Sequence, residues 1–379
     1  MQSIFEQMKA ISNVYTILAR TAMTLLVAVL ATTAWAQTDV ATEAALNSAI
    51  AAGEESNIRL TADITLNDYI QIGQSGTQVV TLDLNGHTLK RNLSEVDANG
   101  HVIEVFTNGT LTLKDGSGND SGQITGGRSN NGGGICNYGT LNFEGGTISA
   151  CYAGETGGGI KNNSGATLNM SGGAVSGCYG QDCGGIYNAD GGTLNITGGS
   201  INGNTSGAGG GGVVNYGTAY ISGGIITGNH ATTRGGGIWS NGTLNMTGGN
   251  ISGNRADIEG GGIYNSGTLN MEGDVAVKDN PISNIYLTSG KKINVTGAIT
   301  SGENSIGISM ESIGVFTSRY DSSALTKSSL VALPRSDAVW ARISLTCSSS
   351  SSGMEILLLL IHPLVTAMAL GEQRSIIIQ

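Results

Sequence analysis

Short apolar stretches alternate with glycine, asparagine and serine along most of the chain, and the alternation recurs at a regular interval. A Gly-Gly-Ile string, or its valine variant, ends at Ile135, Ile160, Ile186, Val213, Ile238 and Ile263. Successive strings are 25, 26, 27, 25 and 25 residues apart. An interval of this size indicates stacked repeats rather than an ordinary globular domain.

Each repeat contains three apolar stretches, Gly-Ile-x-Asn, Thr-Leu-Asn-Met and x-Ile-Ser-Gly, which are too short for helices. The middle one alternates apolar and polar residues with the period of a strand. Three strands and three turns therefore make one triangular coil. One coil cannot bury its apolar face alone, so the sequence predicts an all-β fold, a right-handed parallel β-helix. Leucine-rich repeats and other solenoids are disfavoured, because no part of the repeat could form a helix.

Stacking predicts columns of equivalent residues about 4.8 Å apart. One inward column contains Leu141, Leu168, Leu194, Ala219, Leu244 and Leu269, and the next contains Phe143, Met170, Ile196, Ile221, Met246 and Met271. A polar column contains Asn137, Asn162, Asn188, Asn215 and Asn265, with Ser240 once in their place. Stacked asparagines at a bend can hydrogen-bond along their column and tolerate turn conformations.

The N-terminal end of the repeats carries a different pattern. Residues 42–52 predict a short amphipathic helix with Leu46 and Ile50 on one face, and Gly53 suits its C-terminal stop. We expect residues 37–56 to cap the core of the β-helix and residues 57–318 to form the β-helix itself. A cap of this kind protects a strand edge that would otherwise invite aggregation.

The first 36 residues indicate export. Lys9 and Arg20 precede or flank a short apolar core at 22–31, and Ala34-Trp35-Ala36 offers small residues for cleavage. We interpret 1–36 as a signal peptide and expect an extracellular or cell-surface location. A membrane anchor is the alternative, although the apolar run is shorter than a spanning helix needs.

The C-terminal segment departs from the repeat. Residues 319–379 include Cys347, a run of five serines at 348–352 and an apolar stretch at 354–370 that contains Glu355, His362 and Pro363. We interpret this segment as an irregular, aberrant tail. A C-terminal membrane anchor is the alternative, and any attachment to a membrane would depend on an anchor that the sequence does not identify.

Composition and charge narrow the function. The chain has 61 glycines and only 3 prolines, without the three-residue period of collagen. Its formal net charge is −10, so we expect no nucleic acid among its partners, because an acidic surface repels phosphates.

The repeated motifs resemble a known class of proteins. Gly-Gly-Ile-Tyr-Asn at 261–265, preceded by Gly260, and Ser-Gly-Asn at 252–254 are similar to repeats of chlamydial polymorphic outer-membrane proteins. They are equally similar to adhesin-like β-helix proteins of gut bacteria in the pectate-lyase-like superfamily. The resemblance covers about residues 57–318 and implies a right-handed β-helix at a surface or outside the cell. It does not imply catalysis.

Catalytic chemistry on a β-helix would place carboxylates in one column of neighbouring coils. The acidic residues of the repeats instead fall at scattered positions, and the histidines share no spacing typical of a metal site or a catalytic triad. The sequence therefore predicts no catalytic residue, no metal ligand and no cofactor. An enzyme, a polysaccharide lyase or glycoside hydrolase, is an alternative, because loops could assemble a site that the repeat does not reveal.

Two smaller features remain. Cys151 and Cys178 occupy the position that Asn204, Asn229 and Asn254 hold in later coils, so they can form a disulfide or remain stacked thiols. The residue after each repeat isoleucine points outward by strand alternation, and three of these residues are aromatic: Tyr187, Trp239 and Tyr264. Such a row could bind sugar rings or another protein, or it could reflect only the preference of aromatics for strands.

These observations together predict a secreted or surface-exposed, adhesin-like scaffold. Its expected partner is a polysaccharide or a host or cell-surface glycoprotein, bound through a lateral face. A purely structural cell-surface protein is a further alternative.

Overall fold

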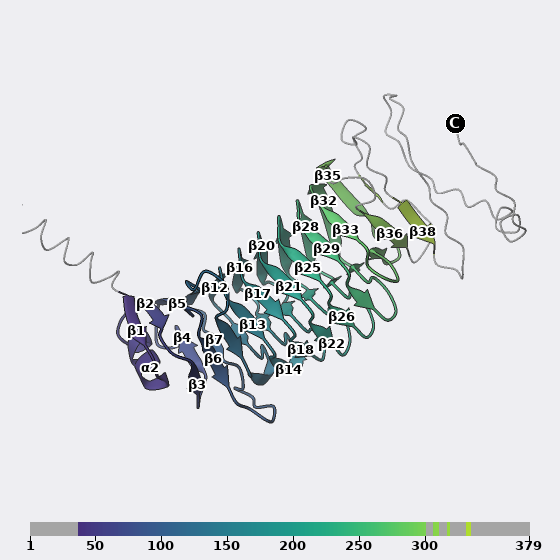
Figure 1. The fold of residues 1–379 in the computed structure, drawn as a ribbon. Helices are drawn as coiled ribbons and strands as arrows, with labels where there is room; N and C mark the ends of the chain where they lie inside the picture. Colours follow the sequence, from purple (N-terminus) through teal and green to yellow (C-terminus); the bar gives the residue numbers. More distant parts are fainter. Residues whose placement is uncertain (1–36, 301–305, 311–316, 319–330, 335–379) are drawn as a thin grey trace, which may run out of the picture.

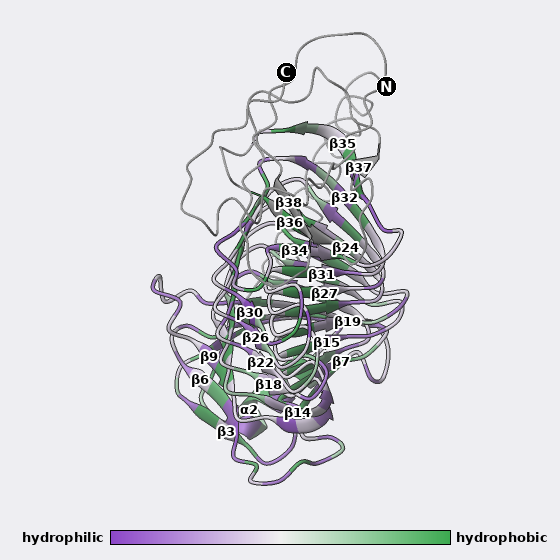
Figure 2. Cartoon of the chain, turned by 90° about the vertical axis from the view of Figure 1, so that its right-hand side faces the viewer, coloured by the Kyte–Doolittle hydropathy of each residue, from purple (hydrophilic) through white to green (hydrophobic). Residues whose placement is uncertain are grey.

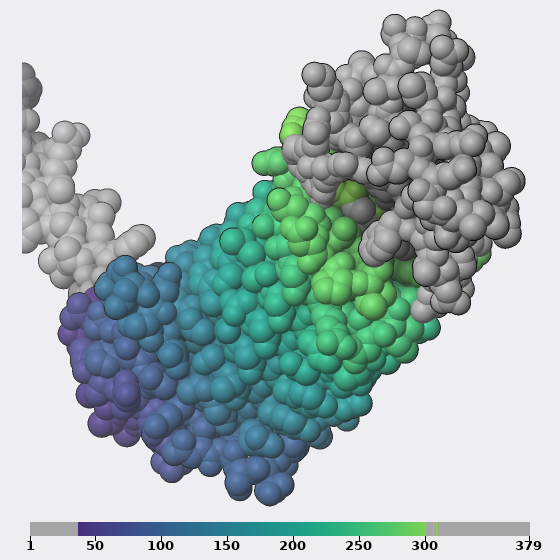
Figure 3. All heavy atoms as spheres, turned by 45° about the vertical axis from the view of Figure 1, so that its right-hand side comes forward, coloured from purple at the N-terminus to yellow at the C-terminus, as the bar shows by residue number. Residues whose placement is uncertain are grey.

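The computed structural model describes residues 37–300, 306–310, 317–318 and 331–334. They form an all-β parallel solenoid of about ten turns, with coils of about 25 residues stacked along one axis (Figure 1). The space-filling view shows the coils as one continuous body that follows the order of the sequence (Figure 3). The predicted parallel β-helix is therefore confirmed. The predicted signal peptide lies outside the described residues, as does the predicted tail except for Val331–Pro334.

Three long parallel sheets run the length of the solenoid. Sheet A contains β1 (Gln37–Val40), β2 (Glu55–Leu60), β5 (Gln78–Asp83), β8 (Gly109–Lys114), β12 (Thr140–Phe143), β16 (Thr167–Met170), β20 (Thr193–Ile196), β24 (Thr218–Ile221), β28 (Thr243–Met246), β32 (Thr268–Gly273), β35 (Ile293–Ile299) and β37 (Thr317–Ser318). Sheet B contains β3 (Ile64–Leu66), β6 (Thr88–Arg91), β9 (Gln123–Thr125), β13 (Thr147–Ser149), β17 (Ala174–Ser176), β21 (Ser200–Asn202), β25 (Ile225–Thr227), β29 (Asn250–Ser252) and β33 (Ala276–Lys278). Sheet C contains β4 (Ile70–Ile72), β7 (Ile103–Val105), β11 (Ile135–Asn137), β15 (Ile160–Asn162), β19 (Ile186–Asn188), β23 (Val213–Asn215), β27 (Ile238–Ser240), β31 (Ile263–Asn265), β34 (Ile285–Leu287), β36 (Gly307–Met310) and β38 (Val331–Pro334).

A fourth short sheet corrects the expectation of three strands in every coil. Sheet D lies between sheets B and C in chain order and contains β10 (Arg128–Asn131), β14 (Tyr152–Thr156), β18 (Tyr179–Gly180), β22 (Thr205–Ser206), β26 (His230–Ala231) and β30 (Arg255–Ala256). Most of these strands place one small, buried residue inward, such as Ser206, Ala231 or Ala256. Because the strands are short and lack a large inward-facing apolar residue, the hydrophobic pattern does not reveal them.

The predicted columns form the core. Leu168 pairs in register with Leu141 and Leu194, and Met170 pairs with Phe143 and Ile196. All of these side chains are at most 2% exposed. Figure 2 shows hydrophobic segments aligned from one coil to the next. Parallel, in-register stacking therefore shares one narrow core among all coils.

Two asparagine columns run along the corners of this core. The predicted column is fully buried, and its Nδ2 to Oδ1 hydrogen bonds are 2.7 Å from Asn137 to Asn162, 2.8 Å from Asn162 to Asn188 and 2.8 Å from Asn188 to Asn215. In the second column, Asn204, Asn229 and Asn254 each donate from Nδ2 and from the backbone amide to the Oδ1 of the next asparagine. The columns satisfy polar groups that burial would otherwise make costly.

The predicted N-terminal helix is present as α2 (Glu43–Ala51), at the N-terminal end of the stack (Figure 1). The Thr42 hydroxyl caps it by accepting from the amide of Ala45, and Leu46 and Ile50 are buried in the core. Strand β1 precedes the helix and pairs with β2, so the first strand of the solenoid lies within the segment predicted as a cap. No helix in the described part of the chain is long and apolar enough to cross a membrane.

Candidate binding face

The outward residues of sheet C form a single row along the solenoid. Lys161 pairs with Tyr187, Tyr187 with Val214, Val214 with Trp239, and Trp239 with Tyr264. The pairing continues to Tyr286 on β34. Because the strands are parallel and in register, the row follows the solenoid axis with one residue in each coil.

Rings from five successive coils contact one another along this row. We name Tyr187, Tyr216, Trp239, Tyr264 and Tyr286 the aromatic ladder. Its ring centroids are separated by 5.7 Å between Tyr187 and Tyr216, 4.9 Å to Trp239, 6.4 Å to Tyr264 and 5.4 Å to Tyr286. The planes of the last three rings are nearly parallel, with interplanar angles of 1° and 7°.

The ladder joins Tyr187, Trp239 and Tyr264, the three aromatic residues singled out from the sequence. Trp239 and Tyr264 are neighbours in the ladder, whereas Tyr187 and Trp239 are linked through Tyr216. Tyr187 and Trp239 are two coils apart, and Val214, which occupies the row between them, is only 3% exposed. Tyr216, two residues after Val214 and 37% exposed, turns its ring back between them.

The side chains of this row point outward, but none of those on the ladder strands is fully exposed to solvent. Cys136 and Val214 are each 3% exposed, and Tyr286 is 4% exposed, whereas Tyr187, Trp239 and Tyr264 are half-buried. The turn between sheets D and C covers part of the row, because a Cβ at Gly210 would lie against the side chain of Val214. The face therefore presents partly sheltered rings rather than a fully exposed stripe.

Positively and negatively charged side chains flank the ladder. The Lys161 Nζ lies 5.9 Å from the Tyr187 ring centroid and donates to Asn131 Oδ1 at 2.8 Å. The Arg234 guanidinium lies 5.3 Å from the Tyr264 ring and pairs with Glu259 at 3.0 Å. Burial, with a smaller contribution from the negative charge of Asp182, raises the pKa of Tyr187 to about 12, so its hydroxyl stays protonated and can donate.

Sequence reasoning missed Tyr286 as a member of the row. The signal was available, because Ile285-Tyr286 matches the isoleucine–aromatic pair of Ile263-Tyr264, but the following asparagine is replaced by Leu287. Sequence reasoning also did not place Tyr216 against these rings, since strand alternation gives no side-chain direction at a turn.

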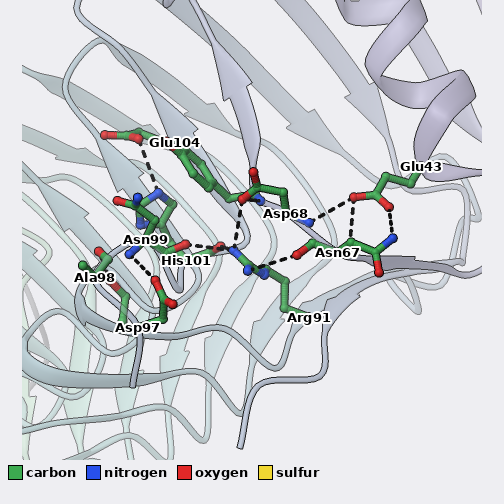
Figure 4. Close-up of polar contacts among 11 residues, drawn as sticks. Glu43, Asn67, Asp68, Arg91, Asp97, Ala98, Asn99, His101 and Glu104 are labelled. Atoms are coloured by element: carbon green, nitrogen blue, oxygen red, sulfur yellow. Dashed lines mark hydrogen bonds and ion pairs between the residues drawn. The ribbon is translucent and has the colours of Figure 1, made fainter. Parts of the chain in front are cut away.

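A polar network closes the N-terminal end of the solenoid (Figure 4). Buried Arg91 donates from Nη1 to the carbonyls of Asn99 at 2.8 Å and His101 at 3.2 Å. Glu43 of α2 accepts from the backbone and side chain of Asn67. These bonds attach the helix and the 92–100 loop to the first coils.

The same network includes a histidine–carboxylate pair. His101 Nε2 lies 3.4 Å from Glu104 Oε2 (Figure 4). The imidazole packs edge-on against Tyr69, with ring centroids 4.6 Å apart. Glu104 pairs in register with Cys136, so it belongs to the outward row of sheet C, N-terminal to the ladder. N-terminal to the rings, the row therefore carries Glu104, Cys136 and Lys161.

Cys151 and Cys178 are stacked as their repeat positions predict. Both are thiols in the structure, each at most 2% exposed, and each immediately precedes one of the paired strands β14 and β18. The hydrogen bond to Cys178 and burial raise the pKa of the Cys151 thiol. The disulfide between them stays a prediction.

The other ionisable groups are dispersed. Asp257 pairs with His230 at 3.1 Å and with Arg255 at 3.0 Å on sheet D, one corner away from the ladder. Within the described ranges, no group of three or more histidine, cysteine or acidic side chains is arranged to hold a metal ion.

Comparison of the chain with protein-family models, curated proteins and solved structures finds no match in any of the three.

Proposed function

We propose that this protein is an exported, adhesin-like β-helix scaffold that binds glycans at a surface through the aromatic ladder. The observation that carries the proposal is the run of contacting rings in five successive coils, 4.9–6.4 Å apart. Aromatic rings supply apolar area together with a polar edge, which suits a sugar with apolar ring faces and hydroxyl rims.

Two further features support this function. The charged and amide groups beside the rings, including Asn131, Arg234 and Glu259, can exchange hydrogen bonds with hydroxyls. The predicted signal peptide and the resemblance to adhesin-like β-helix proteins agree with a surface or extracellular location.

Retention of the full-length chain on immobilised polysaccharides and mucins tests the proposal. The triple variant Tyr187→Ala, Trp239→Ala, Tyr264→Ala should lose retention. Tyr220→Ala is the control, because Tyr220 is 50% exposed on the outward side of β24, on a different sheet, and should bind as the unmodified chain does.

The soluble fraction of the same assay distinguishes the competing functions. Release of shortened sugars would contradict a binding role and favour a lyase or hydrolase. Absence of retention on every glycan would favour a structural surface protein.

A further inference from the structure

We propose that the ligand of the aromatic ladder is an uncharged, extended polysaccharide that lies parallel to the solenoid axis, with about one sugar unit for each coil. This inference deepens the proposed function and rests on it. The direction of the polysaccharide, the length of ligand that the face can hold and the charge of the sugars each follow from the structure.

The direction follows from the arrangement of the rings. The ladder runs along the stacking direction, because its strands pair in register from β19 to β34. A ligand that lay perpendicular to the solenoid axis would meet the rings of only one or two coils. A ligand along the axis can meet the four partly exposed rings of successive coils, Tyr187, Tyr216, Trp239 and Tyr264, whereas Tyr286 is buried and supports Tyr264 from the next coil.

The length of the ladder sets the length of the ligand. The partly exposed rings end at Tyr187 on one side, where the row continues with Lys161 and Cys136, and at Tyr264 on the other, because Tyr286 is buried. Each added sugar should therefore strengthen binding until about four units are in contact, since successive contacts made by one polysaccharide chain cost little further loss of freedom.

The charge follows from the groups around the row. Lys161 and Arg234 are the cations beside the rings. The carboxylates are Glu259, paired with Arg234, Glu104 on the row itself, and Asp182 and Glu155, whose fields act on Tyr187 and Lys161. Two positive and four negative charges leave −2, on a chain of net charge −10. Acidic sugars would be repelled, and uncharged sugars would not.

Calorimetric titration of the full chain with two matched ligand series tests both the length of the ligand along the axis and its charge. The first series is the cello-oligosaccharides from disaccharide to hexasaccharide, which are uncharged, and the second is the oligogalacturonates of the same lengths. We expect the uncharged hexasaccharide to bind about tenfold or more tightly than the disaccharide, because several more ring contacts form. At low salt, the acidic series should bind about tenfold or more weakly at each length, and added salt should narrow the difference.

Two variants test the assignment to these residues. Tyr216→Ala removes the second ring of the ladder, between Tyr187 and Trp239, and should bring the hexasaccharide close to the affinity of a shorter ligand, whereas Tyr220→Ala, in the same coil but on sheet A, should change nothing. Asp182→Asn should strengthen binding of the acidic series and leave the uncharged series as it was. Unchanged thermal unfolding by circular dichroism verifies that each variant is folded.

The possible failures are distinguishable. Equal affinity for short and long ligands would overturn the axial arrangement, and acidic ligands that bind as tightly as uncharged ones would overturn the charge assignment; in both cases glycan binding itself would stand. If no oligosaccharide of either series binds and no polysaccharide retains the protein, the proposed function fails as well.

Discussion

Replacing Asn188 with alanine should destabilise the solenoid far more than the same replacement at Asn195, seven residues further along the chain. Asn188 is fully buried, and its side chain makes four hydrogen bonds of 2.8–3.3 Å, which include those to Asn162 and Asn215 in the neighbouring coils. Alanine removes the donor to Asn215 Oδ1 and leaves that buried acceptor without it. Lost bonds and an unsatisfied buried group together cost about 2–4 kcal/mol.

Asn195 provides the matched comparison. It lies on the outward side of β20, half-buried, and donates to Asn169 Oδ1 at 2.7 Å. Water can replace that partner after substitution, so the expected cost is below about 1 kcal/mol.

Urea unfolding followed by far-ultraviolet circular dichroism measures both costs. Since stacked repeats can lose two-state behaviour, the slopes of the transitions must agree before midpoints are compared. Equal midpoint shifts for the two variants would refute the view that the inner column stabilises the fold through buried hydrogen bonds.

Three further predictions concern stability. Gly237→Ala should destabilise the fold by about 1–3 kcal/mol, because the new Cβ would lie 2.6 Å from the Gly262 carbonyl oxygen. Gly53→Ala should be nearly neutral, because the nearest atom to its new Cβ, the Glu55 carbonyl oxygen, is 3.8 Å away. Thermal melts of the two variants compare these costs. Oxidation should link Cys151 to Cys178 and stabilise the protein by about 3 kcal/mol through closure of the intervening loop, so thiol titration of the unfolded, unreduced chain should count two fewer thiols, and a full thiol count would contradict the disulfide. For Asp115, burial raises the pKa of the carboxyl, but hydrogen bonds from Gly122, Ser117 and Gly86 outweigh burial and hold the pKa below 3.8. The stabilisation that the Asp115 carboxylate provides is therefore present above about pH 4 and is lost as the pH falls through the lowered pKa. Asp115→Asn should flatten the acid limb of a curve of unfolding free energy against pH.

Much of the fold could be predicted because a strand period inside a fixed repeat determines which side chains stack. That logic placed Leu141 beside Leu168 and Asn137 beside Asn162. It missed sheet D, whose inward residues, such as Ala231, are too small to give a hydrophobic signal. It also missed the pairing of β1 with β2, since Gln37–Val40 carries no trace of the repeat.

The candidate site was predictable only in part. Alternation placed Tyr187, Trp239 and Tyr264 on one row, and the structure agrees. The contact that unites them depends on the rotamer of Tyr216 at a turn, which a strand period does not determine. The burial of Val214 depends on the turn that covers it, a contact between segments of the coil rather than a property of one strand.

Trp239 lies inside the aromatic ladder and directly reports whether a sugar contacts it. Emission spectra of the full chain and of Trp239→Phe would be recorded during titration with cellohexaose, and the difference between the two isolates the signal of Trp239. Glycan binding on the ladder predicts a saturable change in that difference spectrum, at concentrations that match the calorimetric affinity. A difference spectrum that stays constant while cellohexaose binds would place the ligand elsewhere and contradict the claim.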